Sequence, residues 1–203
     1  MKERPILFTG PMVRAILSGQ KTVTRRVLKG LDPELLGETM TRAQWQKVNR
    51  ERPVSFGATY FCPFGQPGDR LWVREAWAQI NVAQAPGETW VVYRECDNRT
   101  DYGGPWKPSI HMRRRDSRIL LEITAVRVER LHDITEDQAE AEGVERPENI
   151  TNVDVWDGAE RELFNAMNQP RARFRRLWSD INGSESWDSN PWVWVVEFKR
   201  VTP

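Results

Sequence analysis

The side chains best suited to chemistry lie in residues 19–26, which read GQKTVTRR and follow the end of a predicted helix. A lysine amine, threonine hydroxyls and two guanidinium groups occur within this one segment. Taken alone, the pattern favours a structural role, because threonine is common in strands and lysine keeps surfaces soluble. The chain holds no glycine-rich phosphate loop and no GxSxG, HExxH or EF-hand pattern, so the sequence predicts neither a metal site nor a cofactor.

Three short stretches concentrate positive charge. Residues 20–29 carry four basic side chains and no acid, residues 107–118 are also +4, and residues 171–176 add four arginines, whereas residues 132–148 sum to −6. Such runs are commonly solvated faces. If the basic stretches share one face, they could bind phosphates. The basic residues considered for binding are Arg25, Arg26, Lys107, Arg113, Arg114 and Arg115.

Tryptophan is abundant and histidine is scarce: the chain has 10 Trp, 2 His and 2 Cys. Large aromatic side chains usually fill a core, but one or two, with Trp72 and Trp106 the candidates, could stack on a base. His111 either packs with a hydrogen-bond partner or lines a cleft beside Lys107. Two cysteines suit a reducing compartment and predict no disulfide framework.

The periodicity predicts the elements that must position these side chains. A strand over 5–9 leads into a helix over 12–17 that ends at Gly19, and a strand over 21–27 follows. The turn at 67–69 starts a strand reaching Trp77, and residues 89–93 form another. A long strand spans 118–131, with a bulge near Thr124 or Ala125 where the apolar set changes face.

The C-terminal third is predicted to hold two helices and a closing strand. A capping box begins a helix over 136–142, which ends before Gly143, and a helix with an apolar stripe runs from Pro170 to Asn182. Residues 144–169 are expected to be less regular, and the final strand covers 192–199. Strands with bulges, few helices and no βαβ alternation predict a mainly β, α+β fold: a small β-barrel with appended helices.

Composition limits the class of protein. The 203 residues carry a net charge of +1, with 39% hydrophobic and 29% charged residues, which is typical of one folded domain. We expect a single domain over 1–203 with insertions at about 28–66 and 145–168. Near-neutral charge excludes a uniformly basic coat. Neither a membrane span nor a signal peptide is evident, so we expect a cytoplasmic protein with no membrane partner.

Four motifs in order resemble the ASCH domain family, which is related to the PUA-like RNA-binding fold. They are Gly19-x-Lys21-x-x-Thr24-x-Arg26, the turn and strand from Pro67 to Val73, the acidic helix up to Gly143, and the strand over 192–199. Residues 107–112 look like the phage- and prophage-encoded branch. The resemblance covers most of the chain outside 28–66 and about 145–168, and it implies a small PUA-like barrel with an RNA-related role.

One branch of that family consists of amidohydrolases that convert N4-acetylcytidine to cytidine with a Lys, a Thr and a Glu. The resemblance places these three on Lys21, Thr24 and Glu142, and implies a modified nucleoside as substrate. In that chemistry Thr24 attacks or positions water, Lys21 accepts its proton if Arg25, Arg26 and desolvation lower its pKa, and Glu142 protonates the leaving amine.

The spacing of the first two residues sets a condition on this mechanism. Side chains three apart in an unbroken strand point to opposite faces. Lys21 must therefore sit in the turn before the strand, or a bulge must precede Thr24.

Two other functions remain open from the sequence. A noncatalytic module for RNA or single-stranded nucleic acid would use Lys21, Arg26 and the run Arg113–Arg115 on phosphates. A ribonuclease would need His111 and His132 as an acid–base pair.

Overall fold

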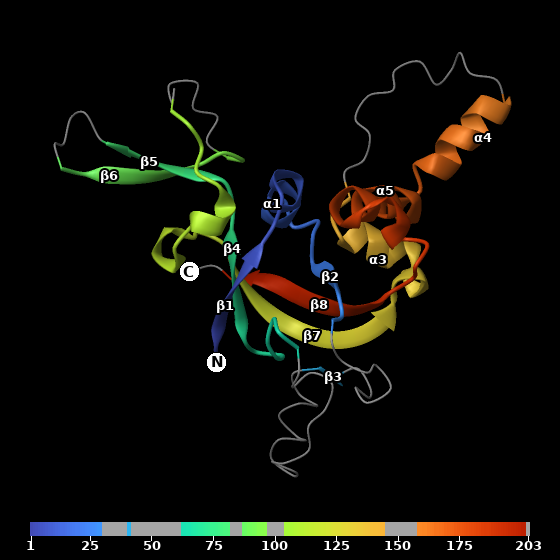
Figure 1. Cartoon of the computed structure of the whole chain (residues 1–203), viewed down its shortest axis with the longest axis horizontal. Helices are drawn as coiled ribbons and strands as arrows, with labels where there is room; N and C mark the ends of the chain where they lie inside the picture. The colour runs from blue at the N-terminus through green and yellow to red at the C-terminus, as the bar shows by residue number, and fades with distance from the viewer. Residues whose placement is uncertain (30–39, 42–61, 82–86, 97–103, 145–157, 202–203) are drawn as a thin grey trace, which may run out of the picture.

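A computed structural model describes residues 1–29, 40–41, 62–81, 87–96, 104–144 and 158–201. Most of the predicted insertion over 28–66, including Trp45, lies outside the described residues, as do residues 145–157. The described residues form a main sheet, a separate two-stranded sheet and helices, most of which lie against the main sheet (Figure 1).

The main sheet holds six strands. Its order is β1-β4-β7-β8-β2, and β3 also pairs with β7. The β1–β4 pair is parallel and the other pairs are antiparallel. The strands are β1 (Glu3–Leu7), β2 (Val23–Val27), β3 (Met40–Thr41), β4 (Arg70–Arg74), β7 (Leu120–Arg130) and β8 (Trp192–Val201).

The expected α+β class is confirmed, but a closed barrel is not shown. The sheet curves strongly along β7 and β8 (Figure 1), with β1 and β2 at the two ends of the strand order. Among the described strands, no ladder joins these two edges. A side chain links them instead: Arg26 Nη2 on β2 donates to the Leu7 carbonyl at the end of β1, at 2.7 Å.

The predicted bulge in the long strand is confirmed. The β7–β8 register shifts between Ile123 and Ala125, so Thr124 is the extra residue. The bulge keeps Ile123 and Val126 in the same buried core although they are three residues apart, because the extra residue changes which face the later side chains occupy.

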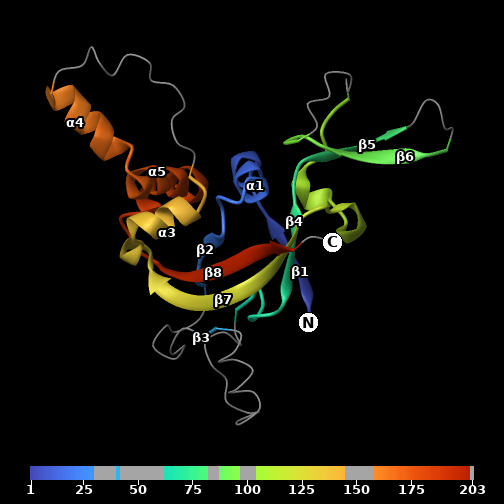
Figure 2. The ribbon, with the colours of Figure 1, turned by 180° about the vertical axis from the view of Figure 1, so that it is seen from behind.

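The strand β8 is covered on both faces, which explains its nearly continuous burial. Trp194, Val196 and Phe198 join the main core with α1 (Gly10–Leu17). The alternate residues Val193 and Val195 join a second core under α3 (Glu136–Ala141) and α5 (Pro170–Asn182). Figure 2 shows α3 and α5 together beside β8, with α1 as a separate neighbour.

Local sequence signals explain the helix ends. The predicted capping box is present, with Thr135 and Gln138 exchanging hydrogen bonds at the start of α3. α1 ends as expected, with Gly19 at φ +80° after its last turn. The helix predicted to begin at Pro170 is α5, with the expected bounds.

Two elements differ from the sequence prediction. The single strand expected to reach Trp77 is two strands, β4 and β5 (Trp77–Asn81), and β5 pairs only with β6 (Thr89–Tyr93) among the described strands. The chain turns away at Glu75, whose buried carboxylate accepts two hydrogen bonds from Arg118 at 2.8 and 2.9 Å. The stretch expected to be irregular contains α4 (Gly158–Met167), because its alanine, glutamate and leucine residues favour helix.

The tryptophans are mostly structural. Five of the described tryptophans are buried, namely Trp72, Trp77, Trp178, Trp187 and Trp194, whereas Trp90 is 52% exposed.

Within the described ranges, no helix has the length and apolar character needed to cross a bilayer.

Gly143 supports a close approach that we expect to be sensitive to substitution. It has φ +72°, and a Cβ there would lie 2.6 Å from the Ala15 Cβ and 2.7 Å from the Lys21 Cβ. Gly143→Ala should therefore lower the free energy of unfolding by about 2–4 kcal/mol, combining left-handed backbone strain with overpacking. Urea unfolding measures this change.

Gly19→Ala is the matched control. Gly19 also has positive φ, at +80°, but a Cβ at this position would have no described atom within 4 Å. Its cost should stay at about 1–2 kcal/mol, the backbone strain alone. Equal costs for the two variants would show that the contact of Gly143 with Lys21 is not tight.

Candidate active site

The position of Lys21 meets the condition set by the sequence. Lys21 lies in the turn between α1 and β2, and β2 begins only at Val23. Its amide donates to the Ala15 carbonyl at 2.9 Å, and the next residue, Thr22, bonds through its backbone to Ala141 and Phe198. The turn is thereby fixed to α1, α3 and β8 at once, which aims the Lys21 side chain independently of the strand alternation.

The Lys21 ammonium is fully buried and has three acceptors. Its Nζ donates to the Val23 carbonyl at 2.8 Å, to the Glu142 carbonyl at 2.8 Å and to Glu142 Oε2 at 2.7 Å. The side chain is 0% exposed. An ammonium has three N–H donors, so each of them is satisfied and none is left to water.

Glu142 joins two buried cations from different elements. It caps the C-terminus of α3, where its Oε2 binds Lys21 and its Oε1 accepts from Arg25 Nη1 at 3.2 Å. Arg25 Nη2 also donates to Gln138 Oε1 at 2.8 Å and to Glu129 Oε2 at 3.2 Å. The carboxylate is therefore oriented by a network that reaches α3 and β7.

Burial shifts the proton affinity of the cations at this site. Loss of hydration lowers the pKa of Lys21, and the neighbouring Arg26 and Arg25 lower the pKa further, while Glu142 acts in the opposite direction. Burial also lowers the pKa of Arg26. The Lys21 amine is thus closer to its neutral, proton-accepting form than a surface lysine is.

Thr24 shares a cavity with Glu142. Thr24 pairs with Val196 on the face of β2 that turns to the main core, and its side chain is almost fully buried. Within the described part of the chain, its hydroxyl has no hydrogen-bond partner. Both residues line a cavity of about 240 Å³. The hydroxyl is therefore available to a ligand or to water in this space.

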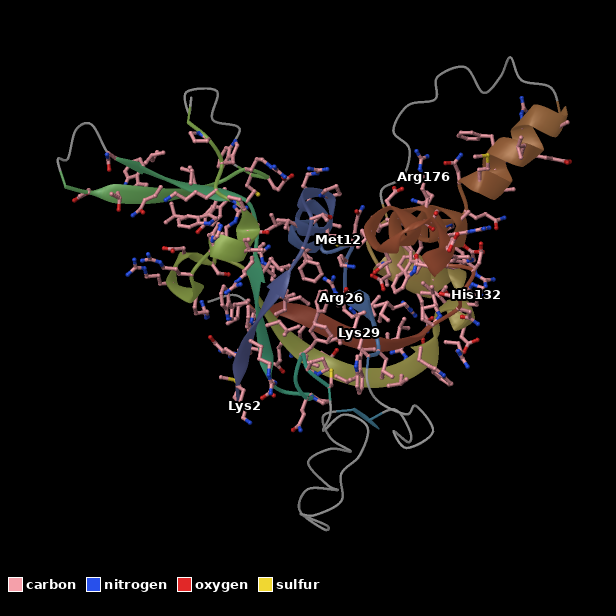
Figure 3. All side chains as sticks on the ribbon, in the orientation of Figure 1. Lys2, Met12, Arg26, Lys29, His132 and Arg176 are labelled. Carbon is pink, nitrogen blue, oxygen red and sulfur yellow. The ribbon has the colours of Figure 1, made fainter. Side chains whose placement is uncertain are left out.

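The cavity has one cationic wall and one apolar wall. Figure 3 labels Met12, Arg26 and Lys29 around it, on α1, on β2 and just after β2. The opposite wall is the apolar stripe of α5. The remaining lining residues are Thr24, Arg25, Val27, Glu142, Phe174, Leu177, Trp178, Ile181 and Asn182.

The other residues proposed for binding lie elsewhere. Lys107 is exposed, with its Nζ 4.8 Å from the centre of the Trp77 ring, and Arg114 pairs with Glu3 at 2.6 Å. Trp72 is buried, and the Arg74 guanidinium lies 4.7 Å from the centre of its ring. Trp106 is partly buried, and the remaining members of this group, His111, Arg113 and Arg115, are exposed.

The two histidines required by the ribonuclease alternative are not brought together. His111 lies in a 3-10 turn before β7, and His132 follows the other end of that strand. Eleven strand residues span roughly 35 Å. The His132 Nε2 is 2.8 Å from the Trp187 carbonyl, and its ring packs on the Trp187 ring. The two histidines of this chain therefore form no acid–base pair.

Several residues of the site escape prediction from the sequence. In the sequence, Lys29 is only one member of a basic run, yet in the structure it lines the cavity. Gln138 is predicted only as part of a helix cap, yet its side chain also binds Arg25. Phe174, Leu177 and Trp178 belong to an apolar stripe that is predicted to pack inward. These residues line the same cavity as Thr24 only because of tertiary packing. The apolar stripe is the one sequence signal that could have indicated the apolar wall of the cavity.

Comparison with known proteins adds little to this geometry. No family model matches the chain. No curated protein matches it. Among solved structures, an ASCH domain from Lactobacillus crispatus JV V101 is similar at 14% identity and a TM-score of 0.35, covering 98% of this chain and 79% of that one. A likeness this weak carries no argument about the site.

The lowered pKa of Lys21 gives a prediction about stability. Between its folded-state pKa and the ordinary 10.5, the unfolded chain holds a proton that the folded chain has released. The free energy of unfolding should therefore rise with pH in that window, and this contribution is lost as pH falls through the folded-state pKa. Urea titrations from about pH 8 to about pH 10 measure the slope, because lysines titrate near 10.4.

Lys21→Met removes this titrating group and is the comparison. Its curve of unfolding free energy against pH should be flatter than that of the wild type over the same interval. Parallel curves would contradict the lowered pKa.

Proposed function

We propose that this chain hydrolyses the N4-amide of acylated cytidines, such as N4-acetylcytidine, at the cavity lined by Thr24 and Glu142. The observation that supports it best is the direct 2.7 Å bond of Lys21 to Glu142, which lines the same cavity as Thr24, whose hydroxyl has no partner among the described residues. The motif resemblance to ASCH-type amidohydrolases, which use a Lys, a Thr and a Glu, points to the same three residues.

A proton shift between Lys21 and Glu142 would prepare both reaction partners. Transfer from the ammonium to the carboxylate produces a neutral amine, which is a base, and a carboxylic acid. The lowered pKa of Lys21 makes this transfer less costly. The amine then takes the proton of Thr24 while the hydroxyl oxygen attacks the acyl carbon.

The remaining steps of the reaction use the same three residues. To stabilise the oxyanion, the restored Lys21 ammonium turns one N–H from its protein acceptors toward the cavity. Glu142 gives its proton to N4 as the C–N bond breaks, which releases cytidine and leaves an ester on Thr24. Water then hydrolyses the ester to the free acid and returns the enzyme to its starting state.

A noncatalytic function in binding RNA or single-stranded nucleic acid is the second candidate. The exposed cations Lys107, Arg113 and Arg115 favour it, together with the half-exposed Trp90. These side chains lie outside the cavity lining. Salt-dependent oligonucleotide binding without turnover would support this function.

Chromatographic detection of cytidine released from N4-acetylcytidine tests the proposed reaction. Thr24→Val, Lys21→Met and Glu142→Gln should each lower the turnover rate at least about 100-fold, because each removes a nucleophile or a proton-transfer group. Thr22→Val is the matched control, since Thr22 is exposed and its hydrogen bonds to Ala141 and Phe198 are made by the backbone.

The pattern of variants decides between the alternatives. Thr22→Val should retain wild-type turnover and thereby show that loss in Thr24→Val reflects the hydroxyl. A folded wild-type protein that releases no cytidine would refute the proposed function, as would full activity in Thr24→Val.

A further inference from the structure

Among the residues that the structure describes, the cavity lining holds more positive than negative charge. This part of the lining includes Arg25, Arg26 and Lys29 but a single carboxylate, Glu142. That carboxylate is already engaged by Lys21 and Arg25. Within the described residues, neither Arg26 nor Lys29 forms an ion pair. Two cations of the cavity are thus without a salt-bridge partner in this part of the chain, and the charge of Glu142 offsets the effect of burial on the pKa of Arg26 only in part.

Arg26 is held in place although it forms no salt bridge with a described carboxylate. Its Nη2 donates to the Leu7 carbonyl at 2.7 Å, and its guanidinium lies 5.5 Å from the centre of the Phe8 ring. Its Nε is buried without a hydrogen-bond partner in the same part of the chain. A guanidinium fixed in this way loses little further conformational freedom on binding an anion, and its planar group suits the oxygens of a phosphate.

The opposite wall suits a different part of a ligand. Phe174, Leu177, Trp178 and Ile181 present apolar surface from α5, and the Phe174 and Trp178 ring centres are 6.0 Å apart. A ligand with a flat, weakly polar part and an anionic part would match both walls. A nucleotide has this division between its base and its phosphate.

We propose that Arg26 and Lys29 form a phosphate subsite, so that the cavity takes a cytidine bearing a 5′-phosphate in preference to the free nucleoside. The identity of the base rests on the proposed function, whereas the phosphate rests on the charges of the cavity. The volume of about 240 Å³ lies just below the range of small-molecule sites, which is about 300–1,000 Å³, and therefore favours a single nucleotide over a strand.

Calorimetric titration with CMP and with cytidine tests the subsite without any turnover. The wild-type protein should bind CMP at least about tenfold more tightly than cytidine, which is the size expected for charge-assisted hydrogen bonds to one phosphate. Arg26→Met and Lys29→Met should each lower the affinity for CMP about three- to tenfold and leave that for cytidine unchanged. Lys29 is exposed, so Lys29→Met should not disturb folding.

Lys2→Met is the matched control. Lys2 is an exposed lysine just before β1, labelled apart from Lys29 in Figure 3, and it does not line the cavity, so its loss should leave both affinities unchanged. An equal effect of Lys2→Met and Lys29→Met on CMP would show nonspecific attraction to positive charge and would overturn the subsite.

Three other results would overturn the proposal: equal affinities for CMP and cytidine, no binding of CMP, or tighter binding of the trinucleotide CpCpC than of CMP. Selective CMP binding that depends on Lys29, in a protein that releases no cytidine from N4-acetylcytidine, would support the subsite and refute only the hydrolysis.

Discussion

The buried ion pair of Lys21 and Glu142 is the interaction on which the rest of the site depends. The two residues are 121 positions apart in the chain, and their contact joins the turn after α1 to the end of α3. Removing one partner of such a pair commonly costs about 3–5 kcal/mol, because a charge is left buried without compensation. The contact of the turn after α1 with the end of α3 is therefore tied to the charge state of these two side chains, and Gly143 allows the backbone to approach closely enough for the pair to form.

This constraint also orders the charges around the cavity. Arg25 shares the Glu142 carboxylate and continues to Gln138 and Glu129, so the face of β2 toward α3 is neutralised by its own network. Thr24 and Arg26 alternate with Arg25 and pair with Val196 and Trp194 on the other face of the sheet. A single edge strand thereby places at the cavity the Thr24 hydroxyl and the Arg26 guanidinium, which forms no salt bridge with a described carboxylate. The helix α5 contributes the apolar wall.

Local features of this fold could be predicted from the sequence, and long-range ones could not. The bulge at Thr124 and the capping box at Thr135 follow from changes in periodicity and from side chains a few residues apart. The break between β4 and β5 depends on the buried bond of Glu75 to Arg118, 43 residues away, which no local pattern indicates. The same limit applies to the site: the motif indicated Lys21, Thr24 and Glu142, but the cavity lining by Lys29 and Trp178 arises only from tertiary packing.

The most direct test is the turnover of N4-acetylcytidine by the double variant Lys21→Met/Glu142→Leu, measured beside its free energy of unfolding. Replacing both members of a buried pair with apolar residues of similar size is often neutral or stabilising by about 1–4 kcal/mol. The double variant should stay folded, because Arg25 keeps Glu129 and Gln138 as partners when Glu142 is lost. If the pair serves the chemistry, this folded variant should release no cytidine. A folded double variant that releases cytidine at the wild-type rate would contradict the catalytic role of the pair, because the pair would then be structural alone.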